Sequence, residues 1–325
     1  MDPVSHILFG RMLSALDGGR RLGRGGLAAL VLGSIAPDVD ILLVPFGFDT
    51  YLYYHELGTH SLPGAVAVAA LVAGLVRGFV RGSRASSILL AAMVGVGGHI
   101  FWDLASGADI RLLHPVSDHR VGWHLVTMGE PAVLLLLLLA TLLRPRGGRR
   151  WATAVLSALM LLLGAKSLSR SAAERAYQGA IVETGPPDLH LLDARPSSLF
   201  AWGVLERRGE RLRCLGVDAR TGDVRLEFER RSVVGDLRVL ASERLRVVRN
   251  LRRVALFPLV WLEKEGAEQS VFWSDFQFCD GSGCVLSFGA SFDERLQPIR
   301  EIVRIGALRQ VRSPQPEEDA DAEPE

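Results

Sequence analysis

Long apolar stretches in the first half of this 325-residue chain constrain its fold more than any other feature. A helix needs about 20 mostly apolar residues to cross a bilayer, and its backbone must satisfy its own hydrogen bonds there. Pro3–Leu16 is apolar but short, so we expect an interfacial or partly inserted helix at that segment. Longer stretches predict five transmembrane spans, Leu27–Phe48, Leu62–Val80, Ser86–Ala105, Gly122–Leu143 and Trp151–Ser167.

Arginine clusters in the loops predict how these spans are oriented. The clusters are Arg20, Arg21 and Arg24, then Arg77, Arg81 and Arg84, and finally Arg144, Arg146, Arg149 and Arg150. The positive-inside rule puts all three clusters in the cytoplasm. Five spans then alternate, and every residue after Ser167 falls on the outer side of the membrane.

The second half of the chain has a different pattern, which predicts a soluble domain. Apolar and polar residues alternate in short stretches separated by Gly/Asp turns, as in β-strands. The predicted strands include Leu212–Val217, Val224–Phe228, Leu237–Leu240 and Val271–Phe278. We therefore expect an α-helical polytopic membrane domain over residues 1–168, a small β-rich soluble domain over 169–312 and a disordered acidic tail over 313–325.

Charge and cysteine content limit the classes of function. The formal net charge of +1 gives no reason to expect a nucleic-acid partner. Three cysteines are too few for a disulfide framework. Cys279 and Cys284 flank a turn-like stretch, and the sequence leaves open whether they form one disulfide in an oxidising compartment or two free thiols.

Histidines and aspartates concentrate in the apolar half of the chain. Seven of the eight histidines lie in the first 124 residues, in or beside the predicted spans. Ionisable groups in a bilayer are costly and usually mark a site or a pathway. Any one of them alone is more often an ordinary interhelical or loop residue, but together they favour a site. The set comprises His6, Asp38, Asp40, His55, His60, His99 and Asp103, and the predicted topology puts all of them after His6 at the outer face.

The spacing of these residues is typical of a metal site. His99 and Asp103 are four residues apart and share one helix face. Asp38 and Asp40 follow Pro37, which disrupts a helix, although local capping is the alternative reading for this pair. Imidazole with carboxylate suits zinc, with manganese or iron also possible, and several carboxylates also admit two metals. By contrast, His114, His119 and His124 lie in a polar loop, and we interpret them as exposed.

The order of these motifs resembles the YdjM-like family of inner-membrane, metal-dependent hydrolases. The resemblance covers about residues 1–170 and rests on Ser5-His6, Pro37-Asp38-Val39-Asp40, His55 with Thr59-His60-Ser61, Gly98-His99 with Asp103, and Leu113-His114-Pro115. It implies a bacterial inner membrane, a polytopic helical domain and a hydrolase related to zinc-dependent phospholipases C. Glu56 and Leu57 follow His55 where the family commonly has Arg-Gly, which makes Glu56 a further candidate ligand or base.

The sequence therefore predicts a divalent-metal hydrolase of an ester or phosphoester at the outer face of the membrane, with a lipid as one candidate substrate. We expect His60, Asp40, His99 and Asp103 to bind the metal, with His6 as a further ligand. Asp38 and His55 are the expected catalytic residues, with Asp38 as the general base toward water.

Two other classes of function are compatible with the same residues. A non-catalytic membrane scaffold holds a structural metal in a closed site with no position left for substrate. A metal or proton transporter needs polar residues that continue toward the cytoplasmic face, and Leu62–Val80 offers none. The sequence thus argues against a transporter more than against a scaffold.

Overall fold

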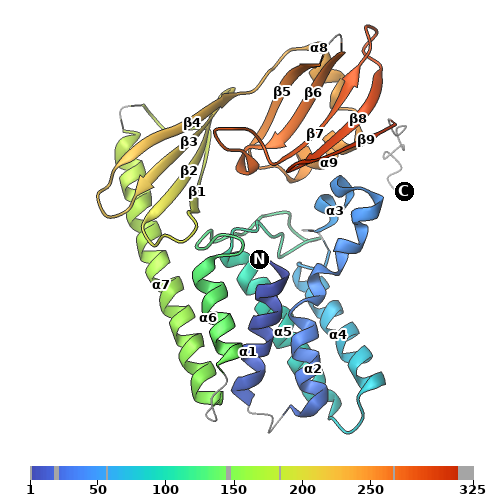
Figure 1. Ribbon diagram of the computed structural model, residues 1–325, viewed down its shortest axis with the longest axis vertical. Coiled ribbons are helices and arrows are strands. Elements are labelled where there is room, and N and C mark those ends of the chain that lie inside the picture. Colours follow the sequence, from blue (N-terminus) through green and yellow to red (C-terminus); the bar gives the residue numbers. More distant parts are fainter. Residues whose placement is uncertain are drawn as a thin grey trace.

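Helices make up most of the described residues up to residue 180, and two sheets form most of the described residues after it (Figure 1). The structure is a computed structural model and describes residues 2–17, 22–55, 58–143, 148–182, 184–265 and 268–313. The helical elements are α1 (Pro3–Asp17), α2 (Gly23–Gly33), the 3-10 helix η1 (Ala36–Phe46), α3 (Phe48–His55), α4 (Leu62–Phe79), α5 (Ala85–Ala105), α6 (Pro131–Leu142) and α7 (Gly148–Ala180).

Three of these helices, α4, α5 and α7, are long and apolar enough to cross a membrane. The pair of α2 and η1 makes a fourth candidate span if it is counted as one, with a bend of 46° between its halves. The break falls at Ser34 and Ile35, just before Pro37, which lies in the first turn of η1, where proline is favoured. The described residues therefore contain three to four candidate spans where the sequence suggested five.

The expected span Gly122–Leu143 is wrong in its first half, because helix α6 begins only at Pro131 and has 12 residues. The N–H groups of Trp123, Leu125 and Val126 instead bond to the last carbonyl groups of α5, at 2.7–3.0 Å. Those N–H groups cap one helix and so cannot start another. The segment between α5 and α6 is therefore irregular and lies over the end of the bundle.

The helix expected at Pro3–Leu16, interfacial or partly inserted, is present as α1, which lies in the helical bundle beside α2, α6 and α7 (Figure 1). Phe9 and Met12 are buried and share a core with Trp102 of α5 and Leu137 of α6. This packing buries an apolar helix that is too short to span a bilayer alone.

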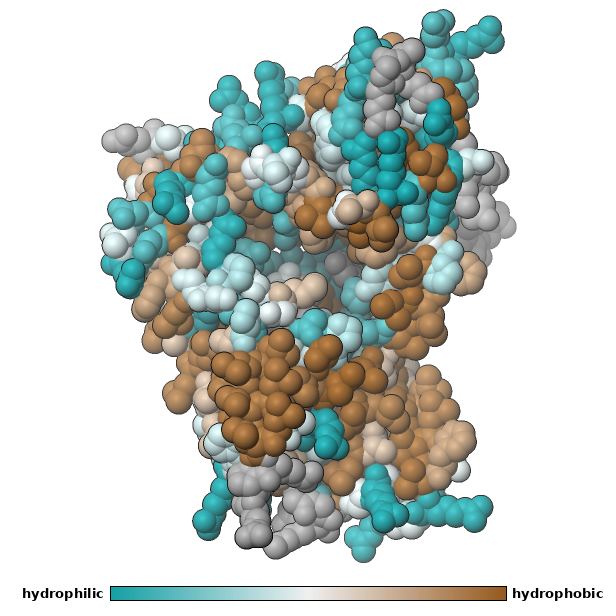
Figure 2. All heavy atoms as spheres, viewed as in Figure 1, coloured by the Kyte–Doolittle hydropathy of each residue, from teal (hydrophilic) through white to brown (hydrophobic). Residues whose placement is uncertain are grey.

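The two ends of the bundle differ. Figure 2 shows hydrophobic surface around the bundle, with hydrophilic surface below it and above it. The described loop arginines, Arg24, Arg77, Arg81, Arg84, Arg149 and Arg150, lie at or near helix ends joined by the short connections at the lower end. Both sheets lie beyond the opposite end (Figure 1). Of the predicted arginines, Arg20, Arg21, Arg144 and Arg146 lie outside the described residues.

The C-terminal region consists of two antiparallel meanders in which each strand pairs with the next one in sequence. The first sheet has strands β1 (Leu189–Ala194), β2 (Ala201–Arg208), β3 (Arg211–Asp218) and β4 (Val224–Arg231). The second has β5 (Pro258–Glu265), β6 (Glu268–Asp275), β7 (Leu286–Phe292), β8 (Pro298–Ile305) and β9 (Leu308–Arg312). A short 3-10 turn, η2 (Phe276–Phe278), follows β6.

Most of the predicted strands are present, but Leu237–Leu240 lies in helix α8 (Leu237–Ser242), which precedes α9 (Arg246–Val254). The side chain of Asp236 accepts a hydrogen bond from the N–H of Arg238 at 2.8 Å and so caps α8. An N-terminal cap of this kind favours a helix over a strand. Cys279 and Cys284 form a disulfide, and Cys214 is a buried free thiol.

Helix α7 continues without a break past residue 168, where the sequence suggested a domain boundary, and joins the bundle to the first sheet. Its Tyr177 donates a hydrogen bond to Glu206 of β2 at 2.8 Å and packs in the same core as Trp202. The expected acidic tail lies outside the described residues from residue 314 onward.

Candidate metal centre

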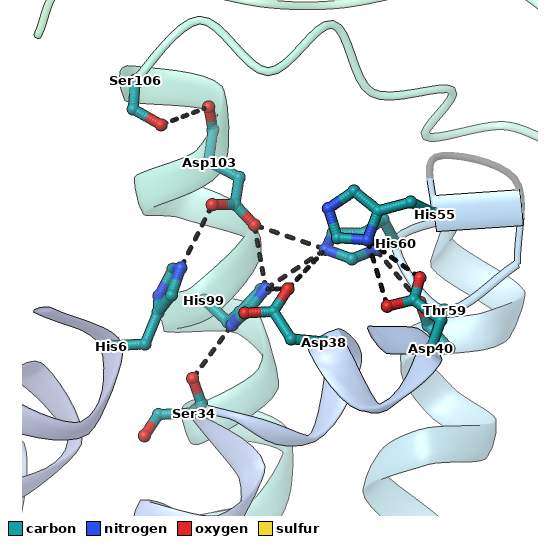
Figure 3. Close-up of polar contacts among 10 residues, drawn as sticks. All are labelled: His6, Ser34, Asp38, Asp40, His55, Thr59, His60, His99, Asp103 and Ser106. Atoms are coloured by element: carbon teal, nitrogen blue, oxygen red, sulfur yellow. Dashed lines mark hydrogen bonds and ion pairs between the residues drawn. The ribbon is translucent and has the colours of Figure 1, made fainter. Parts of the chain in front are cut away.

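Five segments of the N-terminal half meet at the end of the bundle nearest the sheets (Figure 3). Helix α1 contributes His6, η1 contributes Asp38 and Asp40, and α3 ends at His55. His60 precedes α4, and α5 supplies His99 and Asp103. The structure thus brings together residues that are up to 97 positions apart in sequence.

The centre of this cluster is a triangle of three ligand atoms. The Nε2 atom of His99 lies 3.2 Å from the Nε2 of His60 and 2.9 Å from the Oδ2 of Asp103. The third side, from His60 Nε2 to Asp103 Oδ2, measures 3.4 Å. All three residues are buried, with side chains at most 5% exposed.

Asp38 approaches the same two imidazoles. Its Oδ1 lies 3.3 Å from the Nε2 of His99 and 3.6 Å from the Nε2 of His60. The Asp38 side chain is 21% exposed, so it is the more open of the two carboxylates that contact these rings. The imidazole pair therefore has a deeply buried carboxylate and a partly exposed one within reach.

A backbone contact fixes the tautomer of His99. Its Nδ1 lies 2.9 Å from the carbonyl oxygen of Ser34, which can only accept a hydrogen bond. Nδ1 must therefore carry a proton, and in the neutral ring the lone pair of Nε2 points at the cluster. Metal-binding histidines usually have this arrangement, with the second ring nitrogen bonded to a carbonyl or carboxylate.

Close contact between α2 and α5 makes the Ser34 contact possible. A Cβ atom on Gly33 would come 2.6 Å from the carbonyl oxygen of Ala92, and one on Gly95 would overlap the carbonyl oxygen of Leu30 and the N–H of Ser34. Two glycines facing each other thus let the backbones approach closely, as small residues do between membrane helices. The end of α2 is held against α5 one turn before His99.

The Thr59-His60-Ser61 motif has a local structural explanation. The hydroxyl of Thr59 lies 3.0 Å from the Nδ1 of His60, so it orients this ring. Ser61 caps α4, because its Oγ accepts from the N–H of Gly64 at 3.1 Å, and Pro63 occupies the first turn. The hydroxyl of Thr59 therefore orients the ring of His60, and the capped start of α4 fixes its backbone.

Asp40 and His55 form a pair of their own at the edge of the cluster. The Nδ1 of His55 lies 2.9 Å from one carboxylate oxygen of Asp40 and 3.1 Å from the other. The ring of His55 packs edge-on against that of His60, with centroids 4.8 Å apart. Asp40 thus contacts His55, whereas Asp38 contacts His60 and His99.

His6 lies on the inner side of the cluster. Its Nε2 is 3.2 Å from the Oδ1 of Asp103, and its ring stacks on that of His99 at 3.8 Å between centroids. Its Nδ1 is buried without a hydrogen-bond partner among the described residues. His6 therefore bonds the carboxylate oxygen of Asp103 that points away from His60 and His99.

The donor set fits a divalent metal ion. Three groups have ligand atoms close enough for one ion, namely His60, His99 and Asp103; Asp38, His55 and His60; and His6, Asp38 and His99. Ligands of a tetrahedral zinc ion at about 2.0–2.1 Å lie roughly 3.3–3.4 Å from one another. The triangle of His60, His99 and Asp103, with sides of 2.9–3.4 Å, comes close to that spacing.

Sequence reasoning missed three residues of this centre. Ser34 acts through its carbonyl group, which no pattern of residue types reports. Thr59 directly precedes His60 in the Thr-His-Ser motif, and this adjacency was a signal for its contact with the ring. The ring of Tyr51 lies 4.9 Å from that of His55, and burial, followed by the charges of Asp40 and Asp38, raises the pKa of this phenol.

The remaining histidines lie elsewhere, and Glu56 lies outside the described residues. His119 is exposed, and the ring of His114 is 3.2 Å from Asp118 at the surface. His124 is not exposed as expected but 2% accessible, between Asp109 and Asp193. None of these three belongs to a candidate metal group among the residues that the structure describes.

Comparison with known proteins identifies the family of the helical region. A family model described as YdjM inner membrane protein matches residues 1–173, slightly more than half of the chain. The chain therefore belongs to the YdjM inner membrane protein family. No curated protein and no solved structure gave a significant match.

Proposed function

We propose that this member of the YdjM inner membrane protein family is a membrane-bound, metal-dependent hydrolase of an ester or phosphoester. The observation that carries the proposal is the triangle of His60, His99 and Asp103 beside the partly exposed Asp38. Three protein ligands with a fourth position left open are typical of catalytic zinc sites, whereas structural sites are closed by four.

The proposed ligands are His60, His99 and Asp103, with zinc as the preferred ion and manganese or iron as alternatives. A bound divalent ion supplies hydroxide near neutral pH, because it lowers the pKa of a coordinated water to about 7. His6 supports Asp103 through its second carboxylate oxygen. The tautomer of His99, held by Ser34, keeps the lone pair of its Nε2 directed at the centre.

Asp38 is the proposed general base, because it reaches both imidazoles and is open to solvent on one side. A carboxylate in that position can accept the proton of an attacking water. His55, with its ring oriented by Asp40, is the proposed second catalytic group. We thus assign Asp40 to the orientation of His55, and direct metal binding to the three residues of the triangle.

We propose that the centre faces the outer side of the inner membrane. The described loop arginines at the opposite end of the bundle favour a cytoplasmic location for that end. The disulfide between Cys279 and Cys284 agrees with an oxidising compartment for the sheets. A lipid is a reasonable substrate, because Ile41, Leu42 and Phe46 of η1 expose apolar side chains within a few residues of Asp38 and Asp40.

A non-catalytic scaffold with a structural metal is the alternative. Burial of His60, His99 and Asp103 suits a structural metal as well as a catalytic one. The exposed fractions of Asp38, 21%, and His55, 29%, favour catalysis, because a closed structural site needs no acid or base open to solvent. This difference makes hydrolysis our preferred proposal.

Metal analysis of the purified full-length protein tests the proposal. We expect bound zinc, manganese or iron in the wild type and a loss of most of it in His99→Ala and Asp103→Ala. His114→Ala is the matched control, because it removes a histidine whose partner, Asp118, lies at the surface. Equal metal content in all four proteins would contradict the metal centre.

Activity then separates the enzyme from the scaffold. Phosphodiester, carboxylic ester and phospholipid substrates are offered to the metal-loaded wild type and to Asp38→Asn, which keeps the shape of the side chain but cannot act as a base. Hydrolysis that falls at least about 100-fold in Asp38→Asn supports catalysis. Full metal content without turnover of any of these substrates favours the scaffold.

A further inference from the structure

Helix α3, which ends at His55, is built into the core of the C-terminal region. Phe48 and Leu52 of α3 pack against the hydrophobic cluster that contains Val248 and Leu251 of α9 and the inner face of the second sheet. These residues are about 200 positions apart in sequence. Figure 1 shows α3 projecting from the bundle toward α9. The segment that carries His55 thus belongs to two structural units at once.

Polar contacts fix the same helix from a second direction. The carboxylate of Asp49 has no exposed surface, and its Oδ2 accepts a hydrogen bond from Asn250 Nδ2 at 2.9 Å. The guanidinium group of Arg246 lies 3.7 Å from the same oxygen and donates to the hydroxyl of Thr50 at 3.3 Å. A buried carboxylate with so few partners depends on both of them, because an unpaired buried charge is costly.

The next turns of α3 and α9 are also joined, and the irregular segment after α5 binds the end of α9. The guanidinium of Arg253 lies over the ring of Tyr53 and donates to its hydroxyl at 3.2 Å. Arg111 and Arg120 donate to the carbonyl oxygens of Arg253 and Val254, at 2.5–3.1 Å. Helix α9 therefore contacts both segments that border the outer side of the metal centre.

We propose that α9 positions His55, with Asp49 and Asn250 as the positioning residues, and that the C-terminal region thereby controls cation binding at His60, His99 and Asp103 through the contact between the rings of His55 and His60. His55 is the last residue of α3 and contacts Asp40 and the ring of His60. A shift of α3 on α9 moves His55 relative to both. The part of the proposal that concerns a cation rests on the proposed function, whereas the positioning of His55 does not.

Two measurements on the full-length protein in detergent test the proposal. The first is the rate at which diethyl pyrocarbonate modifies His55, followed by mass spectrometry. We expect Asn250→Ala to speed the modification severalfold while leaving that of His114 unchanged. Arg252→Gln is the matched control on the same helix, because the contacts of Arg252 are with Glu243 and the ring of Trp273.

The second measurement is Co²⁺ titration followed by visible absorption, with His55→Ala as the reference. We expect Asn250→Ala to weaken Co²⁺ binding about tenfold and to change the spectrum as His55→Ala does, since groups that orient a metal ligand typically contribute about 10–100-fold to metal affinity and the ring of His55 packs on that of His60. Thr50→Val removes only the hydroxyl that Arg246 contacts and serves if Asn250→Ala does not fold.

The outcomes separate the two claims. An unchanged modification rate of His55 in Asn250→Ala, equal to that of Arg252→Gln, overturns the positioning role. A changed rate in a protein whose wild type binds no Co²⁺ supports the positioning and overturns the metal centre. A changed rate with Co²⁺ affinity equal to the wild type overturns the control of cation binding.

Discussion

His124 is a buried imidazole with a carboxylate at each ring nitrogen. Its Nε2 lies 3.2 Å from Asp109 and its Nδ1 3.5 Å from Asp193 of β1. Two glycines make room for the ring, because a Cβ atom on Gly107 would come 2.6 Å from Nδ1 and one on Gly122 would come 2.9 Å from Nε2. Burial alone would lower the pKa of His124, but hydrogen bonds with Asp109 and Asp193 raise it to about 9.

The charged form of His124 should stabilise the contact between the irregular segment and the first sheet. Since its pKa rises on folding from 6.5 to about 9, this stabilisation is complete below pH 6.5 and is lost as the pH increases through 9. We expect the melting temperature of the wild type to fall over that range by more than that of His124→Gln. His119→Gln, at an exposed position, should follow the wild type. Parallel curves for all three proteins would contradict this role.

The two aspartates of Pro37-Asp38-Val39-Asp40 show how far residue types alone can predict a site. The sequence identified both as members of the centre, because carboxylates after a helix-breaking proline are unusual in an apolar stretch. It assigned Asp40 to the metal and Asp38 to catalysis, whereas in the structure Asp38 contacts His99 and Asp40 contacts His55. In a 3-10 helix, residues two positions apart point roughly 120° away from each other, so only one of the pair can contact the same two imidazoles. The proposed roles of Asp38, as general base, and Asp40, as the residue that orients His55, follow from these contacts.

The close crossing of α2 and α5 supports the geometry of the candidate metal centre. Gly33 and Gly95 bring the two backbones together, and this holds the carbonyl group of Ser34 against His99. An added methyl group at Gly95 meets backbone atoms, which cannot move aside as a side chain can. Alanine at this position therefore separates the helices.

We expect Gly95→Ala to destabilise the protein by about 1–3 kcal/mol, the usual cost of overpacking, and to reduce its metal content. Gly97→Ala is the matched control two residues along the same helix, because a Cβ atom there meets nothing within 4 Å. Thermal unfolding and metal analysis measure the two effects. A Gly95→Ala protein that keeps the stability and metal content of Gly97→Ala would show that close contact is not required.

Elements were predictable where a single periodic pattern dominated. The spans Leu62–Val80 and Ser86–Ala105 agree with α4 and α5 within one residue, because long apolar runs have few alternatives. Gly122–Leu143 failed because N–H groups before Pro131 cap α5, a tertiary contact that no local pattern reports. Leu237–Leu240 failed because the capping signal of Asp236 outweighed a short apolar run.

In the whole molecule, residues 1–173, which match the family model, are joined to the two sheets by tertiary contacts that sequence patterns do not reveal. The matched family model ends at residue 173, inside α7, yet α3 packs in the core of the second sheet. The sequence predicted a β-rich second half, since alternation is a local property. It could not predict contacts between residues about 200 positions apart, such as Asp49 and Asn250.

The proposed orientation makes a prediction for the whole chain. The sheets lie beyond the end of the bundle opposite to the described loop arginines, so we expect the C-terminus outside the cytoplasm (Figure 1). A periplasmic reporter enzyme fused after Glu325 should be active, and a reporter that works only in the cytoplasm should be silent. A fusion in the loop that contains Arg81 should give the reverse pattern. Cytoplasmic activity at the C-terminus would overturn the orientation.

The central claim is that His60, His99 and Asp103 bind one divalent metal ion. X-ray absorption spectroscopy of the purified protein at the edge of the bound metal tests it most directly. For zinc we expect nitrogen and oxygen scatterers at about 2.0–2.1 Å, with the outer scattering of two imidazoles, and one imidazole fewer around the metal that His99→Ala retains. Absence of a metal, sulfur ligands, or an unchanged spectrum in His99→Ala would contradict the claim.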